Sequence, residues 1–338
     1  MLLEKMTQTF GVSGREKPAV EMVKELLSPY VDQVVVDALG SLILYKKGNG
    51  ANKKKLMVAA HIDQIGFCVT GVDANGFLRV RGVGGISLSA THTCRVTFQN
   101  GVRGVILAEE NDWTKNDLSK LYIDIGAKDQ EDALSMISLG DMASYEGELV
   151  QLANDRFLSH GFDDRIGCYI MAECLLSLRE ASPYNDLYFS FSTQEEVGIR
   201  GTRSAANRIQ PDIGIAFDIG SALDTPGEKL SGLGNAVLGG GASIKLMDAG
   251  MISDEGLCRY LKELCEDKGI KTQYEVAAGG GTDGAMIQAA GEGVRATTIS
   301  IPTRYGHTAS EMVDMGDVNA CIALLQEACA ADFTAILS

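Results

Sequence analysis

The sequence predicts an α/β protein in which a mostly parallel sheet lies between helices and carries a small inserted β-rich domain. The first observation is that strand-like and helix-like patterns alternate before residue 66 and after residue 151, as in parallel sheets covered on both faces. The second is a change over 67–150, where short alternating runs are separated by glycine turns. The third is the composition, because 45% hydrophobic residues and 39 glycines suit a globular α/β chain. We therefore expect a discontinuous main domain, 1–66 and 151–338, and a separate domain at 67–150.

Hydrophobic periodicity predicts the individual elements in order. An amphipathic helix is expected over 16–30, and two short strands with a glycine-rich turn over 31–50. The apolar run 55–69 is interpreted as one buried strand that ends in polar groups. In the inserted domain only QEDALSMISL suggests a helix. The later helices are expected over 165–180, 252–269 (capped by Ser253 or Asp254 and ended by Gly269) and 317–337, and the later strands over 186–193, 213–220, 272–277 and 296–302.

Charge and composition exclude several classes of protein. The net charge of −15 argues against a nucleic-acid partner, because a phosphate backbone is bound by a face rich in lysine and arginine. No apolar run approaches the ~20 residues that span a membrane. The N-terminal MLLEKMTQTF contains too short an apolar run for a signal peptide. The eight cysteines form no C-x-x-C motif, so free buried thiols are preferred, and we expect a cytoplasmic protein without a membrane partner.

Polar side chains that could bind a metal ion follow four of the strand-like runs. In open α/β sheets ligands bind at the carboxyl ends of the strands, so we expect these side chains to lie along one edge. They are His61 and Asp63 after LMVAA, Glu195 and Glu196 after LYFSFST, Asp218 after IGIAF, and His307 after ATTISIP. A fifth acidic pair, Asp163 and Asp164, stands directly before the helix predicted at 165–180.

Each of these signals has a simpler structural explanation when it is taken alone. The H-x-D at 61–63 suits a core histidine with a local hydrogen bond, and two aspartates at 163–164 suit a helix N-terminus. Asp218 could be a turn residue or a cap, and His307 a loop histidine. Their convergence nevertheless favours a centre for zinc, cobalt or manganese. One bridging carboxylate would allow two ions ~3.5–4 Å apart, as in hydrolytic two-metal sites.

Seven motifs in order resemble those of the TET-type aminopeptidases, which are dinuclear metallo-aminopeptidases of clan MH. They are HID (61–63), LYIDIGA (121–127), GFDDRIG (161–167), STQEEVGIRG (192–201), AFDIG (216–220), GGGTDGAMIQ (279–288) and RYGH (304–307). The resemblance covers essentially the whole chain. It implies a zinc-peptidase type of α/β fold and an enzyme that hydrolyses the N-terminal residue of peptides.

The resemblance also implies a role for most polar residues of these motifs. His61 binds one metal ion, and Asp63 orients this histidine. Asp163 bridges two ions, and the peptide bond between Asp163 and Asp164 is cis. Glu195 is the general base that takes a proton from a metal-activated water.

The remaining positions follow from the same resemblance. Glu196 binds the same ion as His61 or the neighbouring one. Asp218 and His307 complete the shell of the second ion, although the sequence does not show which ion each terminal ligand serves, and Asp283 faces the substrate pocket. The implied cofactors are two divalent ions per subunit, with zinc or cobalt expected and manganese as a further candidate.

Substrates and assembly are implied in the same way. The expected substrates are short peptides with a free N-terminus. Acidic, neutral and basic N-terminal residues are all cleaved by members of the family, so the preferred residue stays open. The domain at 67–150 is expected to mediate homo-oligomerisation as dimers, which in relatives build hollow tetrahedral dodecamers. Gln64 replaces a glutamate of many relatives, which changes the local charge without removing an expected ligand.

Other functions stay open at this point. A deacylase or a carboxypeptidase could use the same scaffold and the same ions. A glycosidase also uses paired carboxylates, although one tryptophan and 6% aromatic residues are few for a sugar-binding cleft. A non-catalytic assembly or binding protein is the third alternative, and the complete ligand set weighs against it. Of the other histidines, His160 is expected in a loop near the site, and His92 on a strand surface or in packing.

Overall fold

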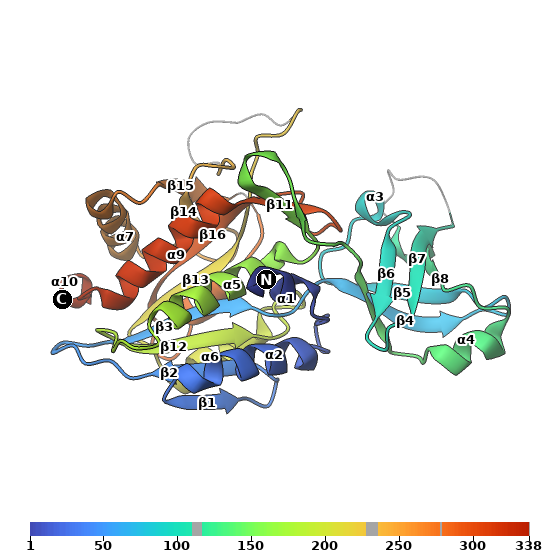
Figure 1. Ribbon diagram of the computed structural model, residues 1–338, viewed down its shortest axis with the longest axis horizontal. Helices are drawn as coiled ribbons and strands as arrows, with labels where there is room; N and C mark the ends of the chain where they lie inside the picture. The colour runs from blue at the N-terminus through green and yellow to red at the C-terminus, as the bar shows by residue number, and fades with distance from the viewer. Residues whose placement is uncertain (110–116, 228–235, 278, 338) are drawn as a thin grey trace.

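The computed structural model describes residues 1–109, 117–227, 236–277 and 279–337, which form two parts (Figure 1). The larger part is built on an eleven-stranded sheet, and the smaller part is a closed barrel beside it. The described helices are α1 (Leu2–Gln8), α2 (Lys17–Leu27), α3 (Leu88–Thr91), α4 (Gln130–Met136), α5 (Phe162–Ser177), α6 (Arg200–Ile209), α7 (Glu255–Lys268), α8 (Asp283–Gln288), α9 (Met315–Ala330) and α10 (Thr334–Leu337), with 3-10 turns at Ser28–Tyr30, Leu118–Lys120 and Ala153–Asp155.

The strands divide between the two parts. The large sheet contains β1 (Gln33–Val36), β2 (Leu42–Lys46), β3 (Lys55–His61), β10 (Val150–Gln151), β11 (Arg156–Ser159), β12 (Asp186–Ser192), β13 (Ile213–Ser221), β14 (Ala242–Met247), β15 (Thr272–Val276), β16 (Arg295–Arg304) and β17 (Glu311–Asp314). The barrel contains β4 (Gly66–Val72), β5 (Leu78–Val83), β6 (Arg95–Phe98), β7 (Arg103–Ala108), β8 (Leu121–Asp124) and β9 (Met142–Tyr145).

The large sheet is parallel at its centre and antiparallel at its edges. Its order is β1-β2-β12-β3-β13-β16-β17-β11-β10, and β14 pairs with β16 and with β15 beside this path. The strands β12, β3, β13 and β16 run parallel to one another. Their register places His61 beside Ser192 and Asp218 beside Ser300. The carboxyl ends of the central strands therefore form one edge, which is where ligands bind in such sheets.

Helices cover both faces of the sheet because apolar residues of the central strands alternate between two cores. Leu56 and Val58 of β3 pack in the larger core with α1, α2, α5, α7 and α9. Met57 and Ala59 of the same strand pack in a smaller core with α6 and α8. A strand whose successive side chains point to opposite faces can be apolar throughout only when both faces are covered.

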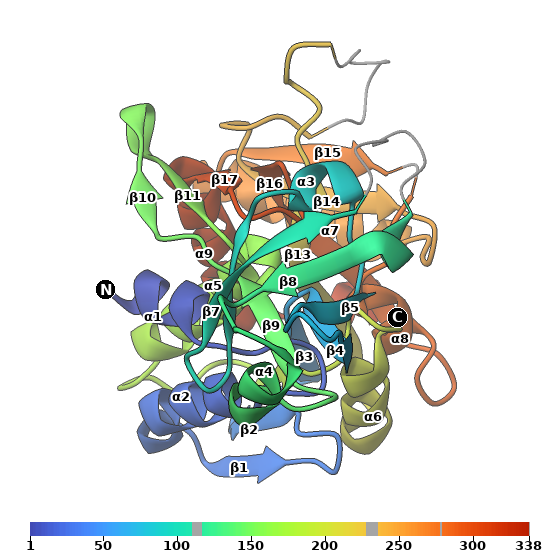
Figure 2. The same ribbon diagram turned by 90° about the vertical axis from the view of Figure 1, so that its right-hand side faces the viewer.

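The barrel closes in the order β4-β5-β8-β7-β6-β9 and is antiparallel throughout. It has an apolar core of its own, which includes Phe67 and Phe98. In Figure 2 the barrel faces the viewer, in front of the large sheet. The chain leaves the large sheet after His61 to enter the barrel, and it re-enters the large sheet at β10, which pairs with β11. Barrel residues can therefore reach the carboxyl edge of β3.

Most elements agree with the sequence-based expectations, and α7 shows why. Its cap Asp254 accepts a hydrogen bond from the backbone N–H of Leu257, and Gly269 ends the helix in the left-handed conformation. The single strand expected over 55–69 is wrong, because β3 ends at His61 and β4 starts at Gly66. Residues 56–67 are all buried, since the chain passes from one apolar core directly into the other.

Other differences are local. The helix expected over 317–337 stops at Ala330, and a separate short helix, α10, follows. His92 lies in a turn after α3 rather than in a strand. Patterns in the sequence did not predict α1, α3, α6, α8, β11, β14 or β17. All eight cysteines are free, as expected. In the described ranges, no helix has both the length and the apolar character that crossing a bilayer requires.

Candidate active site

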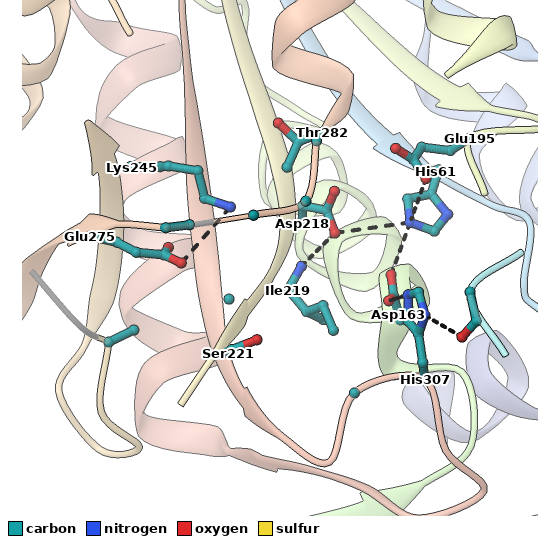
Figure 3. Close-up of a pocket in the computed structure, with 18 of the residues that line it drawn as sticks. His61, Asp163, Glu195, Asp218, Ile219, Ser221, Lys245, Glu275, Thr282 and His307 are labelled. Carbon is teal, nitrogen blue, oxygen red and sulfur yellow. Dashed lines mark hydrogen bonds and ion pairs between the residues drawn. The ribbon is translucent and has the colours of Figure 1, made fainter. Parts of the chain in front are cut away.

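The first cluster of potential metal ligands lies where β3 and β13 end and α5 begins (Figure 3). His61 Nε2 is 3.0 Å from Asp163 Oδ1 and 3.9 Å from Asp218 Oδ1, and all three residues are buried. The Nδ1 of His61 lies 3.1 Å from the backbone carbonyl of Asp63. A carbonyl only accepts, so Nδ1 donates this hydrogen bond and Nε2 is the nitrogen available to a cation.

A second cluster shares Asp163 with the first. The Nε2 of His307 is 3.0 Å from Asp163 Oδ2 and 3.6 Å from Glu196 Oε2. The Nδ1 of His307 donates a hydrogen bond of 2.8 Å to the carbonyl of Gly85. Because Gly85 follows β5 in the barrel, the inserted domain orients a histidine of the main domain.

The structure shows a grouping of the ligands that the sequence left open. The resemblance implied that Asp218 and His307 complete the shell of the second ion, but the sequence does not show which ion each terminal ligand serves. In the structure Asp218 lies with His61, because β13 is the neighbour of β3 in the sheet. His307 lies with Glu196 instead. Only Asp163 belongs to both clusters, with one carboxylate oxygen directed at each histidine.

Asp63 has a different set of contacts from the one expected for a residue that orients His61. Its carboxylate is 3.6 Å from His61 Nδ1, which is farther than the backbone carbonyl of the same residue. It accepts hydrogen bonds from Ser13 Oγ at 2.5 Å, from Glu195 N at 2.9 Å and from Glu196 N at 3.2 Å. The Asp63 side chain is fully buried, so it serves mainly as the support of the turn that carries the two glutamates.

A tight turn presents Glu195 to the site. Gln194 and Ile199 have positive φ angles of 57° and 51°, and Gly198 has a φ of 124°. The backbone N–H groups of Gly198 and Ile199 both donate to the carbonyl of Glu195. This turn places Glu195 Oε2 4.0 Å from His61 Nε2, at the wall of a cavity. A carboxylate in this position can exchange a proton with a molecule bound between the histidines.

Glu311 is a supporting residue that the sequence analysis did not identify. Its Oε1 accepts the backbone N–H of His307 at 2.8 Å, and its Oε2 accepts the backbone N–H of Asp163 at 3.0 Å. The side chain is 1% exposed. The only sequence signal is an acid at the start of the strand EMVD, which is too common to be informative.

Burial and mutual repulsion raise the pKa of carboxyl groups in the site. The pKa of Glu195 is raised to about 10 by burial and by the charges of Asp218 and Asp283, against the opposing effect of His61. Burial and the charge of Asp163 raise the pKa of Asp218 to about 7. These shifts mean that, without cations, the buried carboxyl groups tend to keep their protons because the site does not stabilise all of them in the ionised form.

The second cluster shows the same imbalance. Burial and the charge of Asp163 raise the pKa of Glu196 to about 8. Burial lowers the pKa of His307, but its hydrogen bond to Asp163 and the nearby carboxylates raise it to about 11 overall. The same kinds of contact raise the pKa of His61 well above its ordinary value. In the protein without metal, both imidazoles thus tend to be protonated, and their positive charges partly balance the carboxylates that a cation would otherwise balance.

The residues present fit divalent cations. Within each cluster one ligand atom per residue lies within 4.8 Å of the others. All of these atoms are imidazole nitrogens or carboxylate oxygens, the donors that zinc, cobalt and manganese accept. The Oε1 of Glu196 is buried and has no hydrogen-bond partner among the described residues. A buried carboxylate oxygen without a donor is unfavourable unless a cation compensates it.

A cavity of about 1040 Å³ opens in front of both clusters. Asp283, which was expected to face the substrate, does not line this cavity; it is the first residue of α8 and is 1% exposed. Its Oδ2 accepts a hydrogen bond of 2.5 Å from Ser192 Oγ, so it supports the end of β12. The neighbouring Thr282 occupies the cavity wall instead. The turn before α8 decides which of these two adjacent side chains faces the cavity.

Other residues near the clusters have structural contacts. The peptide bond between Asp163 and Asp164 is cis, as expected. His160 lies in the loop before α5, and its Nδ1 donates to the carbonyl of Gly147 at 2.7 Å, so it belongs to neither cluster. The side chain of Gln64 is buried.

Taken together, this fold and this site define a metallopeptidase. The chain is 34% identical over 353 residues to the lysyl aminopeptidase of Pyrococcus furiosus, with 98% of each chain covered. Its fold matches aminopeptidase APDkam598 from the archaeon Desulfurococcus kamchatkensis, with a TM-score of 0.92, 35% identity, and 97% of this chain and 93% of that chain covered. It also matches the Pyrococcus horikoshii TET1 peptidase, with a TM-score of 0.87, 30% identity, and 97% and 98% covered.

The match to a family model decides the classification. Residues 40–324 match the model described as M42 glutamyl aminopeptidase. The chain belongs to this family of metal-dependent aminopeptidases, which confirms the resemblance stated from the sequence motifs.

Proposed function

We propose that this aminopeptidase uses two divalent ions, one held by His61, Asp163 and Asp218 and one by Asp163, Glu196 and His307. The observation that supports this most directly is the position of Asp163, whose two oxygens each lie 3.0 Å from a different histidine. A carboxylate shared in this way is the bridging ligand of two-metal hydrolases. The donor set favours zinc or cobalt, with manganese as a further candidate.

Glu195 is the general base of the proposed reaction. When bound, the ions would lower the pKa of a coordinated water toward ~7 and would polarise the scissile carbonyl. The positive charge of the bound ions would favour the ionised form of Glu195, against the effect of burial, so that its carboxylate could take a proton from the attacking water and deliver it to the leaving amine. Asp63 holds Glu195 through the backbone of the turn, so the carboxylate does not have to be ordered during the reaction.

The proposed substrates are short peptides with a free N-terminus. The matched family and the Pyrococcus furiosus relative are described as aminopeptidases, which act at a free N-terminus. This supports peptides with a free α-amino group over the N-acylated substrates of a deacylase and the C-terminal substrates of a carboxypeptidase. The glycosidase alternative is weaker as well, because each cluster combines carboxylates with a histidine, whereas glycoside hydrolysis requires only a pair of acids.

We also propose that the protein forms homo-oligomers in the cytoplasm. The Pyrococcus horikoshii TET1 peptidase can assemble into a tetrahedron or a large octahedral shell. In the barrel, Leu134 and Leu139 are 47% and 65% exposed, which suits a surface that is covered in dimers or in a tetrahedral dodecamer. Eight free cysteines suit a reducing compartment.

The central experiment replaces Glu195 with glutamine. General-base catalysis contributes about 10²–10⁴-fold, so kcat should fall by that factor while two equivalents of metal remain bound. Kinetics on an aminoacyl fluorogenic substrate and elemental analysis of the same sample measure both quantities. Glu292→Gln, at an exposed position, is the matched control and should match the wild type. Near-wild-type turnover by the Glu195 variant, or faster cleavage of N-acetylated than of free-amine peptides, would contradict the proposal.

A further inference from the structure

The cavity contains a buried ion pair that the proposed catalytic mechanism does not use. Lys245 of β14 and Glu275 of β15 are cross-strand neighbours, with register partners at these two positions. Both line the cavity, and both are about nine-tenths buried or more, with 4% and 5% exposure. Figure 3 shows them on the opposite side of the cavity from His61 and His307, with Asp218 between.

The two side chains are close, but they do not satisfy one another. Their nearest atoms, Lys245 Nζ and Glu275 Oε1, are 3.9 Å apart, which is too long for a hydrogen bond. The Oε2 of Glu275 has no hydrogen-bond partner among the described residues. A buried ion pair stabilises a fold only when additional hydrogen bonds satisfy its remaining donors and acceptors. This pair therefore contributes little to the stability of the fold, and its unsatisfied groups are available to bind a polar group of the substrate.

Glu275 lies against the strand that carries the proposed metal ligand Asp218. A Cβ built on Gly220 would lie 2.9 Å from Glu275 Oε2, so the carboxylate lies against the backbone of Gly220. Gly220 is two residues after Asp218 on β13 and therefore on the same face, about 6.6 Å further along the strand. The absence of a side chain at Gly220 allows the Glu275 carboxylate to lie against this strand, on the cavity wall that Asp218, Gly220 and the ion pair share. By standard bond lengths an extended glutamine side chain reaches about 5 Å from its Cα.

The charges of the pair determine what it can recognise. An acidic side chain of the substrate would form an ion pair with Lys245 but would be repelled by the carboxylate of Glu275. A basic side chain would pair with Glu275 but would be repelled by Lys245. An apolar side chain would leave both groups without hydrogen bonds. A carboxamide offers an acceptor to Lys245 and donors to Glu275 at the same time. A neutral group with both functions suits the pair without breaking its charge balance, and a carboxamide places its acceptor and its donors on two separate atoms, whereas a hydroxyl has one oxygen for both.

Resting on the proposed aminopeptidase function, we propose that Lys245 and Glu275 select a carboxamide side chain, foremost that of glutamine, at the N-terminal residue of the substrate. The ammonium of Lys245 donates to the amide oxygen, and the carboxylate of Glu275 accepts from the amide nitrogen. Asparagine is shorter by one methylene and is a weaker substrate for that reason.

The test compares fluorogenic substrates with N-terminal glutamine, asparagine, glutamate, lysine and leucine. For the wild type, kcat/KM for glutamine should exceed that for glutamate and for lysine by about tenfold or more. Glu275→Gln removes the negative charge at constant volume and should raise the ratio of glutamate to lysine hydrolysis. Lys245→Met keeps the apolar stem and should lower this ratio. The matched control is Lys268→Met, which breaks the surface pair with Glu327 at 2.7 Å and should leave the ratio unchanged.

The outcomes separate this inference from the proposed function. Efficient cleavage of leucine together with equal cleavage of glutamine, glutamate and lysine would overturn the inference and leave the aminopeptidase intact. So would a wild type that prefers glutamate or lysine. If the metal-loaded enzyme cleaved no substrate, calorimetry with free L-glutamine, L-glutamate and L-lysine would still test the pair. Glutamine should then bind most tightly, and a tighter complex with either charged amino acid would overturn the inference.

Discussion

Replacing Asp63 with asparagine tests whether this carboxylate supports the turn that carries Glu195 and Glu196. Its two oxygens accept from Ser13 Oγ and from both glutamate N–H groups. Asparagine has one acceptor oxygen and one NH2 group, so at least one buried donor would face another donor. A lost bond to a charged group is worth about 1.5–3 kcal/mol, and the bonds that remain lose their charge assistance. We therefore expect the free energy of unfolding to fall by about 2–4 kcal/mol.

The activity of the same variant distinguishes support of the turn from orientation of His61. Since the turn positions Glu195, kcat should fall by about tenfold or more while both metal equivalents remain bound. Denaturant unfolding, steady-state kinetics and metal analysis measure the three quantities. Ser13→Ala removes only one of the hydrogen bonds to this charged carboxylate and leaves no donor facing a donor, so it should cost about 1.5 kcal/mol, at the low end of the same range. An Asp63→Asn enzyme with wild-type stability and wild-type kcat would refute the reasoning, and loss of one metal equivalent would return Asp63 to its expected role beside His61.

Two further predictions concern the metal-free protein and the barrel. Burial raises the folded pKa values of Glu195 and Asp218 to about 10 and about 7. Above pH 5 the folded state therefore keeps protons that the unfolded state has lost. The Tm of the metal-free protein should consequently fall as the pH rises from about 5 to 9. A Tm that rises over this window after chelation would contradict the assignment. Gly85→Ala places a Cβ 2.5 Å from His307 Nδ1 and should weaken binding of one ion by about 10–100-fold in a metal titration. The barrel control Gly71→Ala, whose Cβ has no neighbour closer than 3.8 Å, should bind both ions normally.

Local patterns in the sequence were sufficient for much of the fold and for the identity of the ligands. Strand-like runs that end in acids or histidines predict where functional side chains collect, because the carboxyl ends of parallel strands meet at one edge. Helix signals are equally local, as the cap Asp254 and the terminal Gly269 of α7 show. The passage from β3 to β4 was missed because the apolar stretches LMVAA and IGFCV are only a few residues apart, and residues 56–67 are all buried.

By itself, then, the sequence determined the class of fold, the change of pattern over 67–150 and the set of residues from which the ligand clusters are built. Only the tertiary structure decided how these residues are grouped and supported. Asp218 joins His61 because their strands pair, and Gly85 reaches His307 across 222 positions of the chain. The support from Asp63 and the pairing of Lys245 with Glu275 likewise depend on which strands and turns are adjacent. Such contacts join segments distant in the chain, and hydrophobic periodicity reports only the environment of each segment, not its neighbours.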